Sequence, residues 1–422
     1  MRPPKPPEFA GAGRSARYPN SIDSDELAMP STGMKLSDRI TNLTAGGSDG
    51  WDVFYRARAM IAAGEQITEL TIGEHDIRTP PMILEAMNAS AKGGHTGYAM
   101  VAGTDSLRDT VAARVQARTG VATTRDNVLI TPGGQSALFA AHSAVCDDGD
   151  RALFIDPFYA TYPGTIRAVG AKPLAIQAHA SNAFQPRASD IAAVAPGARS
   201  LLINSPNNPT GVVYGRDTLE GIADVCRRHD LWLISDEVYD TQVWNGAHIS
   251  PRALPDMAER VLVVGSMSKS HAMTGSRCGW IVGPRDMISH LVNLATHTTY
   301  GVPGFIQDAA RFALDQGAGL EAEIAAPFQR RRALAKEILA GQNAVGLVPP
   351  QGAMYLMLDV SATALSGEDF ANALLDEHHI AVMPGESFGR AAARHVRVAM
   401  TIEDAAFGAA LERLCRFAAG FT

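Results

Sequence analysis

The stretch Ser266-Met-Ser-Lys269-Ser-His-Ala-Met-Thr-Gly275-Ser-Arg277-Cys-Gly279-Trp280 says most about the fold and function of this chain. It directly follows an apolar run, residues 261–265, which predicts a buried strand. A desolvated lysine near other cations can act as a Schiff-base nucleophile, and Lys269 follows that strand closely. Ser266 and Arg277 offer a hydroxyl and a bidentate guanidinium, which suit a phosphate. Without further motifs, Lys269 would be interpreted as a solvated surface lysine.

Strand-like and helix-like segments alternate around this stretch. Short apolar runs at 128–131, 152–155, 201–204 and 231–235 predict further buried strands. Apolar spacing predicts helices at 105–118, 136–146 and 217–229. This alternation indicates an α/β fold with a mostly parallel sheet covered by helices.

The pattern changes after about residue 300. It predicts an Arg-rich helical region at 306–340, strands at 354–359, 380–383 and 396–400, and helices at 367–377 and 402–418. We therefore expect a small α+β domain at 299–422 after a large cofactor domain at 66–298, an N-terminal arm at 36–65 and a Pro-rich flexible tail at 1–35.

Composition limits the class of protein. The chain has 422 residues, a net charge of −7 and 46% hydrophobic residues, which is typical of a globular protein with a large core. Mild acidity argues against a nucleic-acid binder. Four scattered cysteines indicate neither a disulfide scaffold nor a metal site, and favour the cytoplasm. No apolar run is long enough for a membrane span, and the tail lacks the apolar core of a signal peptide.

Three more motifs each follow a predicted strand. Residues 131–137, Thr-Pro-Gly-Gly-Gln-Ser-Ala, would expose backbone N–H groups at a helix N-terminus. Residues 204–211, Asn-Ser-Pro-Asn-Asn-Pro-Thr-Gly, form a rigid loop with carboxamides. Asp236, in the run 235–239, would emerge at the carboxyl end of a strand, where open α/β sheets bind ligands. Taken singly, these motifs are also typical of ordinary turns and caps.

Together these residues resemble the fold type I, class I/II aminotransferases that use pyridoxal 5′-phosphate. The resemblance runs from about Leu36 to the C-terminus. It implies the fold of that family and an enzyme that moves the amino group of an L-amino acid to a 2-oxo acid. A ping-pong mechanism and an acceptor such as pyruvate or 2-oxoglutarate are expected with it.

The resemblance implies roles around the cofactor ring. Lys269 matches the lysine that bonds to the cofactor and later moves the proton. Asp236 matches the carboxylate that pairs with the pyridine nitrogen and so makes the ring an electron sink. Tyr239 and Asn208 resemble the pair that binds the ring hydroxyl, and Tyr159 resembles the aromatic residue that stacks on the ring.

Other matches concern the cofactor phosphate. Ser266, Arg277 and the backbone of Gly134 and Gln135 resemble the phosphate cup. Tyr98 matches a tyrosine that reaches the phosphate of the neighbouring subunit, which implies a homodimer with shared active sites.

The substrate carboxylate has its own matches. Arg397 resembles the arginine that binds it with a planar fork, and Gly73 and Asn208 resemble residues that contact it. The loop departs from the family pattern at His75 and Ile77, where proline and phenylalanine are usual. His75 could contact the substrate or be a structural histidine.

Longer runs at 51–57, 268–275 and 300–310 look most like the arginine:pyruvate transaminase branch. An arginine donor would need an acidic partner, because an unpaired buried charge is costly. The nearby candidates are Glu74, Asp240 and Asp52. The sequence leaves basic, neutral and aromatic donors open.

Two alternatives remain from the sequence alone. One is a lyase or decarboxylase with the same fold and cofactor. The other is a transcriptional regulator with an aminotransferase-like domain, for which the region before Leu36 is too short and Pro-rich to hold a helix-turn-helix domain.

Overall fold

The computed structural model describes residues 34–48 and 50–421. The chain divides into two units, Met1–Leu36 and Ser37–Thr422, and the account below concerns the second unit. The predicted flexible tail lies outside the described residues, apart from Met34 and Lys35.

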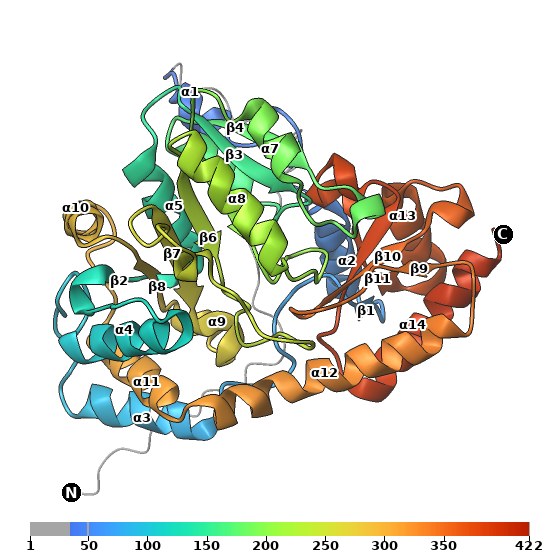
Figure 1. The fold of residues 1–422 in the computed structure, drawn as a ribbon. Coiled ribbons are helices and arrows are strands. Elements are labelled where there is room, and N and C mark those ends of the chain that lie inside the picture. The colour runs from blue at the N-terminus through green and yellow to red at the C-terminus, as the bar shows by residue number, and fades with distance from the viewer. Residues whose placement is uncertain (1–33, 49, 422) are drawn as a thin grey trace, which may run out of the picture. The chain divides into compact units, whose positions relative to one another are not determined.

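A seven-stranded sheet forms the centre of the larger core (Figure 1). Its strand order is β2-β8-β7-β6-β5-β3-β4, and it is parallel except for β8, which runs antiparallel to both neighbours. The strands span Val128–Thr131 (β2), Arg151–Asp156 (β3), Lys172–Gln177 (β4), Ala198–Asn204 (β5), Trp232–Asp236 (β6), Val261–Ser266 (β7) and Gly279–Val282 (β8). Every residue of β2, β7 and β8 is buried, as expected when helices cover both faces.

Successive residues along each strand of the seven-stranded sheet point to opposite faces of the sheet. Val261 and Val263 of β7 belong to one buried cluster with residues of α3, α4, α7, α8 and α11, whereas Leu262 and Val264 belong to another with residues of α5, α6 and α10. These helices span Pro81–Lys92 (α3), Asp105–Thr119 (α4), Gly133–Val145 (α5), Tyr162–Ala168 (α6), Ala188–Val194 (α7), Arg216–Arg228 (α8), Arg285–Thr296 (α10) and Gly304–Asp315 (α11). The predicted covered α/β sheet is confirmed.

A second core surrounds a four-stranded antiparallel sheet of order β12-β13-β10-β9. A separate parallel pair joins β1 to β11. The strands span Thr68–Glu69 (β1), Gly346–Leu347 (β9), Tyr355–Asp359 (β10), Ile380–Ala381 (β11), Met383–Pro384 (β12) and His395–Ala399 (β13). The single strand predicted at 380–383 is therefore two strands that belong to different sheets.

The remaining helices are α1 (Asp38–Thr41), α2 (Asp52–Ala62), α9 (Met267–Ser270), α12 (Ala318–Ala340), α13 (Gly367–His378) and α14 (Asp404–Ala419). Figure 1 shows α12, in orange, running from the neighbourhood of α11 to α14, so it extends along both cores. Within the described residues, no helix is long and apolar enough to cross a membrane. The division into domains at residue 298 stays a prediction.

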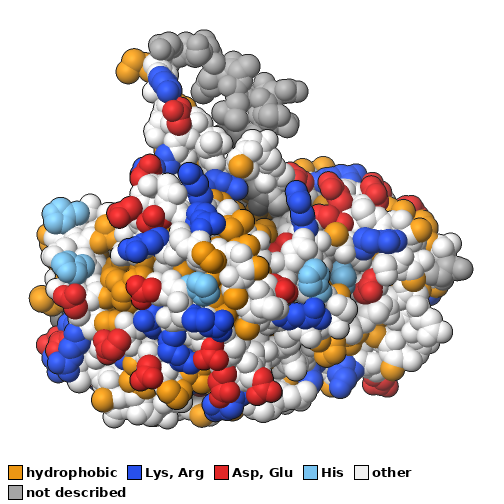
Figure 2. All heavy atoms as spheres, turned by 45° about the horizontal axis from the view of Figure 1, so that its top comes forward, with side chains coloured by type: hydrophobic (Ala, Val, Ile, Leu, Met, Phe, Trp, Pro, Cys, Tyr) orange, Lys and Arg blue, Asp and Glu red, His pale blue; other side chains and the backbone are white. Residues whose placement is uncertain are grey.

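Acidic and basic side chains are mixed over the face drawn in Figure 2. This face carries no broad patch of a single charge, although the chain has a net charge of −7.

Candidate active site

Three neighbouring strands end at one edge of the seven-stranded sheet. β5 ends at Asn204, β6 at Asp236 and β7 at Ser266, and Asn204 is paired with Asp236 in the sheet register. The sequence motifs after these strands therefore meet in space, as expected for the carboxyl ends of parallel strands.

Lys269 lies on α9, the single helical turn after β7. Its Nζ donates a hydrogen bond to the carbonyl oxygen of Gly73. The pKa of Lys269 is lowered to about 8, mainly by burial; Glu74 opposes this shift, and Arg397 and Arg277 add to it. Such an amine is neutral far more often than an ordinary lysine, which is what a nucleophile or proton carrier needs.

Asp236 is buried and accepts two hydrogen bonds. Tyr162 donates its hydroxyl to Oδ2 at 2.7 Å, and the backbone N–H of Val238 donates to Oδ1 at 3.3 Å. Burial raises the pKa of Asp236 to about 6, while the bond from Tyr162 lowers it. Sequence reasoning missed Tyr162, because a tyrosine at the start of a short helix carries no signal of this contact.

A tyrosine from the other core completes the site. The Tyr355 hydroxyl lies 3.0 Å from that of Tyr239 and 3.5 Å from Nδ2 of Asn208. Tyr355 begins β10, where Met357 is paired with Arg397 of β13. The sequence predicted the strand but not this role, since the pairing of β10 with β13 cannot be deduced from local pattern.

Arg397 is 1% exposed, and its guanidinium lies between the rings of Tyr355 and Phe388, at 4.5 and 4.4 Å from their centroids. Its nitrogens donate to Oδ1 of Asn208, at 2.9 Å, and to the carbonyl oxygen of Thr71. Its Nε has no hydrogen-bond partner, and no carboxylate in the described part of the chain pairs with it. A buried cation with a spare donor is matched to an anionic ligand.

Gly73 lies at the contact between Tyr355 and Lys269. A Cβ on Gly73 would lie 1.8 Å from the Tyr355 hydroxyl, so only glycine fits while its carbonyl faces Lys269. His75 is buried edge-on to Phe328, with 5.2 Å between ring centroids, and its ring nitrogens have no hydrogen-bond partner. Burial lowers the pKa of His75 to about 3, so its ring is neutral.

The residues expected at the phosphate gather at the N-terminus of α5. Gly133 has a φ of +80°, and a Cβ there would lie 2.3 Å from Nη2 of Arg277, so glycine leaves a cradle for the guanidinium. Ser266 lies beside Gly134, because a Cβ on Gly134 would lie 3.8 Å from that of Ser266. Together with the N–H groups that open α5, these donors form an anion site.

Three further residues expected at the cofactor are Tyr159, Gln135 and Tyr98, and the electrostatic neighbours of Tyr159 include Arg397, Asp236 and Arg277. Tyr159 is half-buried and packs edge-on against Tyr162, with ring centroids 5.8 Å apart, next to the partner of Asp236. Gln135 uses its side chain to bind Thr161 and Thr165, which leaves its backbone for the anion site. Tyr98 is 92% exposed and packs against Tyr300, apart from the other site residues of its own chain.

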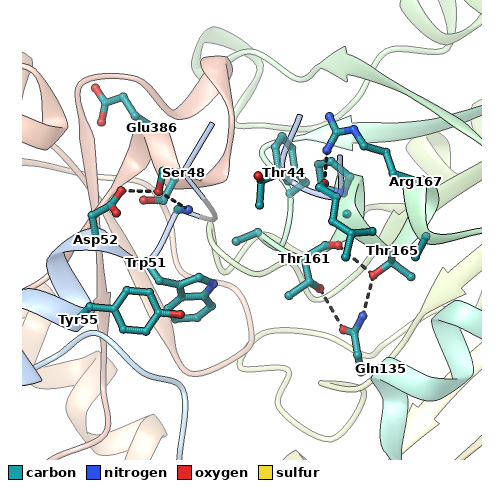
Figure 3. Close-up of a pocket in the computed structure, with 18 of the residues that line it drawn as sticks. Thr44, Ser48, Trp51, Asp52, Tyr55, Gln135, Thr161, Thr165, Arg167 and Glu386 are labelled. Atoms are coloured by element: carbon teal, nitrogen blue, oxygen red, sulfur yellow. Dashed lines mark hydrogen bonds between the residues drawn. The ribbon is translucent and has the colours of Figure 1, made fainter. Parts of the chain in front are cut away.

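A cavity of about 1010 Å³ opens beside the anion site and is lined by Gln135 and Arg277. Trp51, Asp52 and Tyr55, from the start of α2, line the facing wall (Figure 3). Of the three acidic candidates, Asp52 lies on this wall, and Glu74 accepts a hydrogen bond from Thr274. Asp240 is held by Arg114 and Arg118 and is not available to a substrate.

These groups fit pyridoxal 5′-phosphate. The donors at the N-terminus of α5 suit a phosphate, the buried carboxylate of Asp236 suits a ring nitrogen, and the amine of Lys269 suits an aldehyde. The buried guanidinium of Arg397, which has no carboxylate partner among the described residues, suits a carboxylate ligand.

Comparison with known proteins identifies the class. Residues 65–414 match the family described as aminotransferase class I and II. The chain is 40% identical to the arginine–pyruvate transaminase of Pseudomonas aeruginosa over 87% of its length and 94% of that protein. It is 30% identical to an aspartate aminotransferase of Geobacillus stearothermophilus over 91% of its length and 99% of that protein.

Solved structures agree with this family. The aspartate aminotransferase of Thermus thermophilus with maleate superposes with a TM-score of 0.85 at 32% identity, over 91% of this chain and 99% of that one. The chain therefore belongs to the class I and II aminotransferases. It is a transaminase of the fold type I architecture, with pyridoxal 5′-phosphate as its cofactor.

Proposed function

We propose that this transaminase binds the α-carboxylate of an L-amino acid at Arg397, with arginine as the donor and pyruvate as the acceptor to be tested first. The observation that carries the proposal is the buried guanidinium of Arg397, which has a spare Nε donor and no carboxylate partner among the described residues. Asn208 and the Tyr355 ring hold the guanidinium in place, and Gly73 offers a backbone contact nearby.

When bound, pyridoxal phosphate accepts the amino group of the donor and withdraws electrons from the carbon that loses a proton. In the proposal, Lys269 is the covalent attachment point, and its Nζ then carries that proton. Asp236 holds the ring nitrogen while Tyr162 orients its carboxylate. Tyr239 and Asn208 hold the ring hydroxyl, and Tyr159 lies against the ring.

Ser266, Arg277 and the backbone of Gly134 and Gln135 are the proposed phosphate ligands. Their support is the convergence of a hydroxyl, a guanidinium and a helix N-terminus at one point, which favours an anion.

Two observations support arginine as the donor. The relative at 40% identity bears the name arginine–pyruvate transaminase. The cavity next to the anion site also has Asp52 and two aromatic rings in its wall, which suit a guanidinium. Neutral donors and 2-oxoglutarate as acceptor remain within the proposal.

We also propose a cytoplasmic homodimer, with Tyr98 completing the phosphate site of the partner subunit. Its support is the exposure of Tyr98, together with Tyr300 at 54% and Met100 at 69%, because exposed apolar side chains gathered on one surface are typical of an interface. The four cysteines are free and buried, as in a reducing compartment. We further propose that each subunit consists of a large cofactor domain at 66–298 and a small domain at 299–422.

A half-reaction screen tests the donor. The holoenzyme is mixed with single amino acids without an oxo acid, and the visible absorption of the cofactor is followed. Arginine should convert the spectrum and release its 2-oxo acid. Conversion by alanine or an aromatic amino acid but not by arginine would make the donor wrong while leaving the family assignment intact.

Lys269→Ala tests the central residue. The variant should lose turnover and the visible band of the attached cofactor, yet still bind free pyridoxal phosphate through the anion site. Retained transaminase activity would show that Lys269 is not the attachment point.

A further inference from the structure

A ring of four charged side chains lies behind the turn that carries Tyr239. Arg114 and Arg118 of α4 face Asp240, in that turn, and Glu321, in the first turn of α12. Each arginine contacts both acids: Arg114 lies 3.5 Å from Asp240, Arg118 lies 3.4 Å from Glu321, and the pairs Arg114–Glu321 and Arg118–Asp240 are closer. We call these four residues the charge ring.

Three of the four side chains in the charge ring are largely removed from water, whereas that of Arg118 is 35% exposed. The side chains of Asp240 and Glu321 are 17% and 9% exposed, and that of Arg114 is 14% exposed. Burial would raise the pKa of Asp240, but Arg114 and Arg118 outweigh it and lower the pKa below its usual range. A carboxylate with two guanidinium partners in such surroundings has one well-defined position.

Backbone hydrogen bonds carry that position to the active site. The N–H of Asp240 donates to the carbonyl of Glu237 at 2.9 Å, and the N–H of Gln242 donates to that of Tyr239 at 2.8 Å. These bonds define two overlapping turns, residues 237–240 and 239–242, and both contain Tyr239 and Asp240. The Gln242 side chain continues the path, since its Nε2 donates to the carbonyl of Lys269 at 3.2 Å.

Asp240 does not face the cofactor. Its carboxylate points to the charge ring, on the side where a cavity of about 30 Å³ is also lined by Glu237, His248 and Trp280. It therefore acts on the site only through its neighbours in the chain. Glu321 belongs to the same ring but lies on α12 and has no part in the turn.

We propose that Asp240 is a positioning residue: the charge ring fixes the turn at Asp240, and the turn places the Tyr239 hydroxyl for the cofactor. The inference rests on the proposed function, because it needs Tyr239 to contact the cofactor ring. The charge ring would thus influence catalysis through the position of Tyr239, without contact to cofactor or substrate.

The test compares two variants of the same ring, Asp240→Asn and Glu321→Gln. Each removes one negative charge and leaves the same two arginines, so both should lower the melting temperature. Only Asp240→Asn should move the pH midpoint of the cofactor's visible absorption, by about half a unit or more, in the direction that Tyr239→Phe moves it. It should also lower kcat about tenfold or more while KM changes less.

The double variant Asp240→Asn/Tyr239→Phe separates positioning from general loosening. Its absorption midpoint should equal that of Tyr239→Phe alone, because the effect of Asp240 passes through the Tyr239 hydroxyl. If Asp240→Asn does not fold, Asp240→Glu and Glu321→Asp form the same comparison with smaller changes.

Equal midpoints for the two ring variants would overturn the proposal, as would additive shifts in the double variant. If Tyr239→Phe moves the midpoint and Asp240→Asn does not, the proposed function stands and the positioning role fails. If Tyr239→Phe itself leaves the midpoint unchanged, the role of Tyr239 is wrong and the inference falls with it.

Discussion

Arg397 is a buried cation without a carboxylate partner among the described residues, an arrangement that is costly to a folded protein. It is buried between two aromatic rings, and its hydrogen bonds go to neutral oxygens rather than to a carboxylate. Burial also lowers its pKa. The free protein thus keeps a desolvated cation without a carboxylate partner among the described residues, and in the proposed function the substrate carboxylate fills that place.

Replacing Arg397 with lysine should expose this dependence. Lysine keeps the charge but loses the planar fork and the contact between two rings, so kcat/KM for the amino donor should fall about a hundredfold or more. Stopped-flow half-reactions give this value. The cofactor's own absorption should stay unchanged, and a matching loss of cofactor binding would contradict a role limited to the substrate.

The pKa of Lys269 gives a prediction for the cofactor-free protein. An amine with a pKa of about 8, rather than the ordinary 10.5, is mostly protonated below pH 8 and neutral above it. The rate at which added pyridoxal phosphate attaches should therefore rise with pH and level off just above pH 8. A stopped-flow series on the apoenzyme measures the midpoint.

Arg397→Met serves as the matched variant for this measurement. Arg397 lowers the pKa of Lys269, so removing its charge should move the midpoint upward. A midpoint near 10.5 in the unmodified protein would contradict the effect of burial.

At the scale of single elements, α12 makes ion pairs with residues that are distant in the sequence. Buried Arg331 of α12 lies 2.7 Å from Asp76, in the loop that follows Gly73, and 2.7 Å from Asp404 at the start of α14. It also donates to the carbonyl of Met400 at 2.9 Å. The helix therefore links the loop that follows Gly73 to the residue after β13, the strand that carries Arg397.

Arg331→Met should lower the free energy of unfolding by about 3–5 kcal/mol, because it leaves the Asp76 carboxylate without its partner. Arg330→Met is the control: Arg330 lies 2.9 Å from Asp404, but its side chain is 60% exposed, so the change should cost less than about 1 kcal/mol. Urea denaturation distinguishes the two values. Equal losses would mean that the anchor at Arg331 is no stronger than a surface pair.

The helices and strands differ in how well the sequence predicted them. The strands at 128–131 and 261–265 were located to within a residue, because every residue of both strands is buried and a fully buried strand is an almost unbroken apolar run. β4 was missed because Lys172, Pro173 and Gln177 interrupt its apolar run, and Ile176 is the single buried residue of the strand. The helices α2, α3 and α10 were not predicted from the sequence.

The candidate site also contains residues that the sequence could predict and residues that it could not. Residues within one motif, such as Lys269 and Arg277, could be proposed from spacing and resemblance. Tyr162 and Tyr355 could not, because their contacts with Asp236 and Tyr239 depend on segments distant in the chain. Asp240 was named as a candidate for the substrate's cation, whereas the structure pairs it with two arginines.

For the whole molecule, the proposed homodimer leads to a complementation test. Lys269→Ala and Tyr98→Ala subunits should each be nearly inactive when assembled alone. In a mixed dimer, one site would combine an intact Lys269 with an intact Tyr98 of the partner subunit. Random mixing makes half of the dimers hybrids, so activity should recover to about a quarter of that of the unmodified enzyme.

Mixtures are prepared by unfolding and refolding the two variants together, and separately folded subunits mixed without exchange are the control. No recovery after verified exchange would mean that each subunit completes its own site.

The pairing of β1 with β11 affects how this protein is made. Thr68 is paired in register with Ile380 and donates its N–H to the carbonyl of His379, so β1 can pair only after a strand near the end of the chain has been made. At about 5–20 residues per second, the ribosome delivers that partner tens of seconds later. Leu70 and the apolar face of α2, with Val53 and Ala57, stay uncovered for that interval. The newborn chain can close its central sheet early, but it needs protection from aggregation until its last hundred residues emerge.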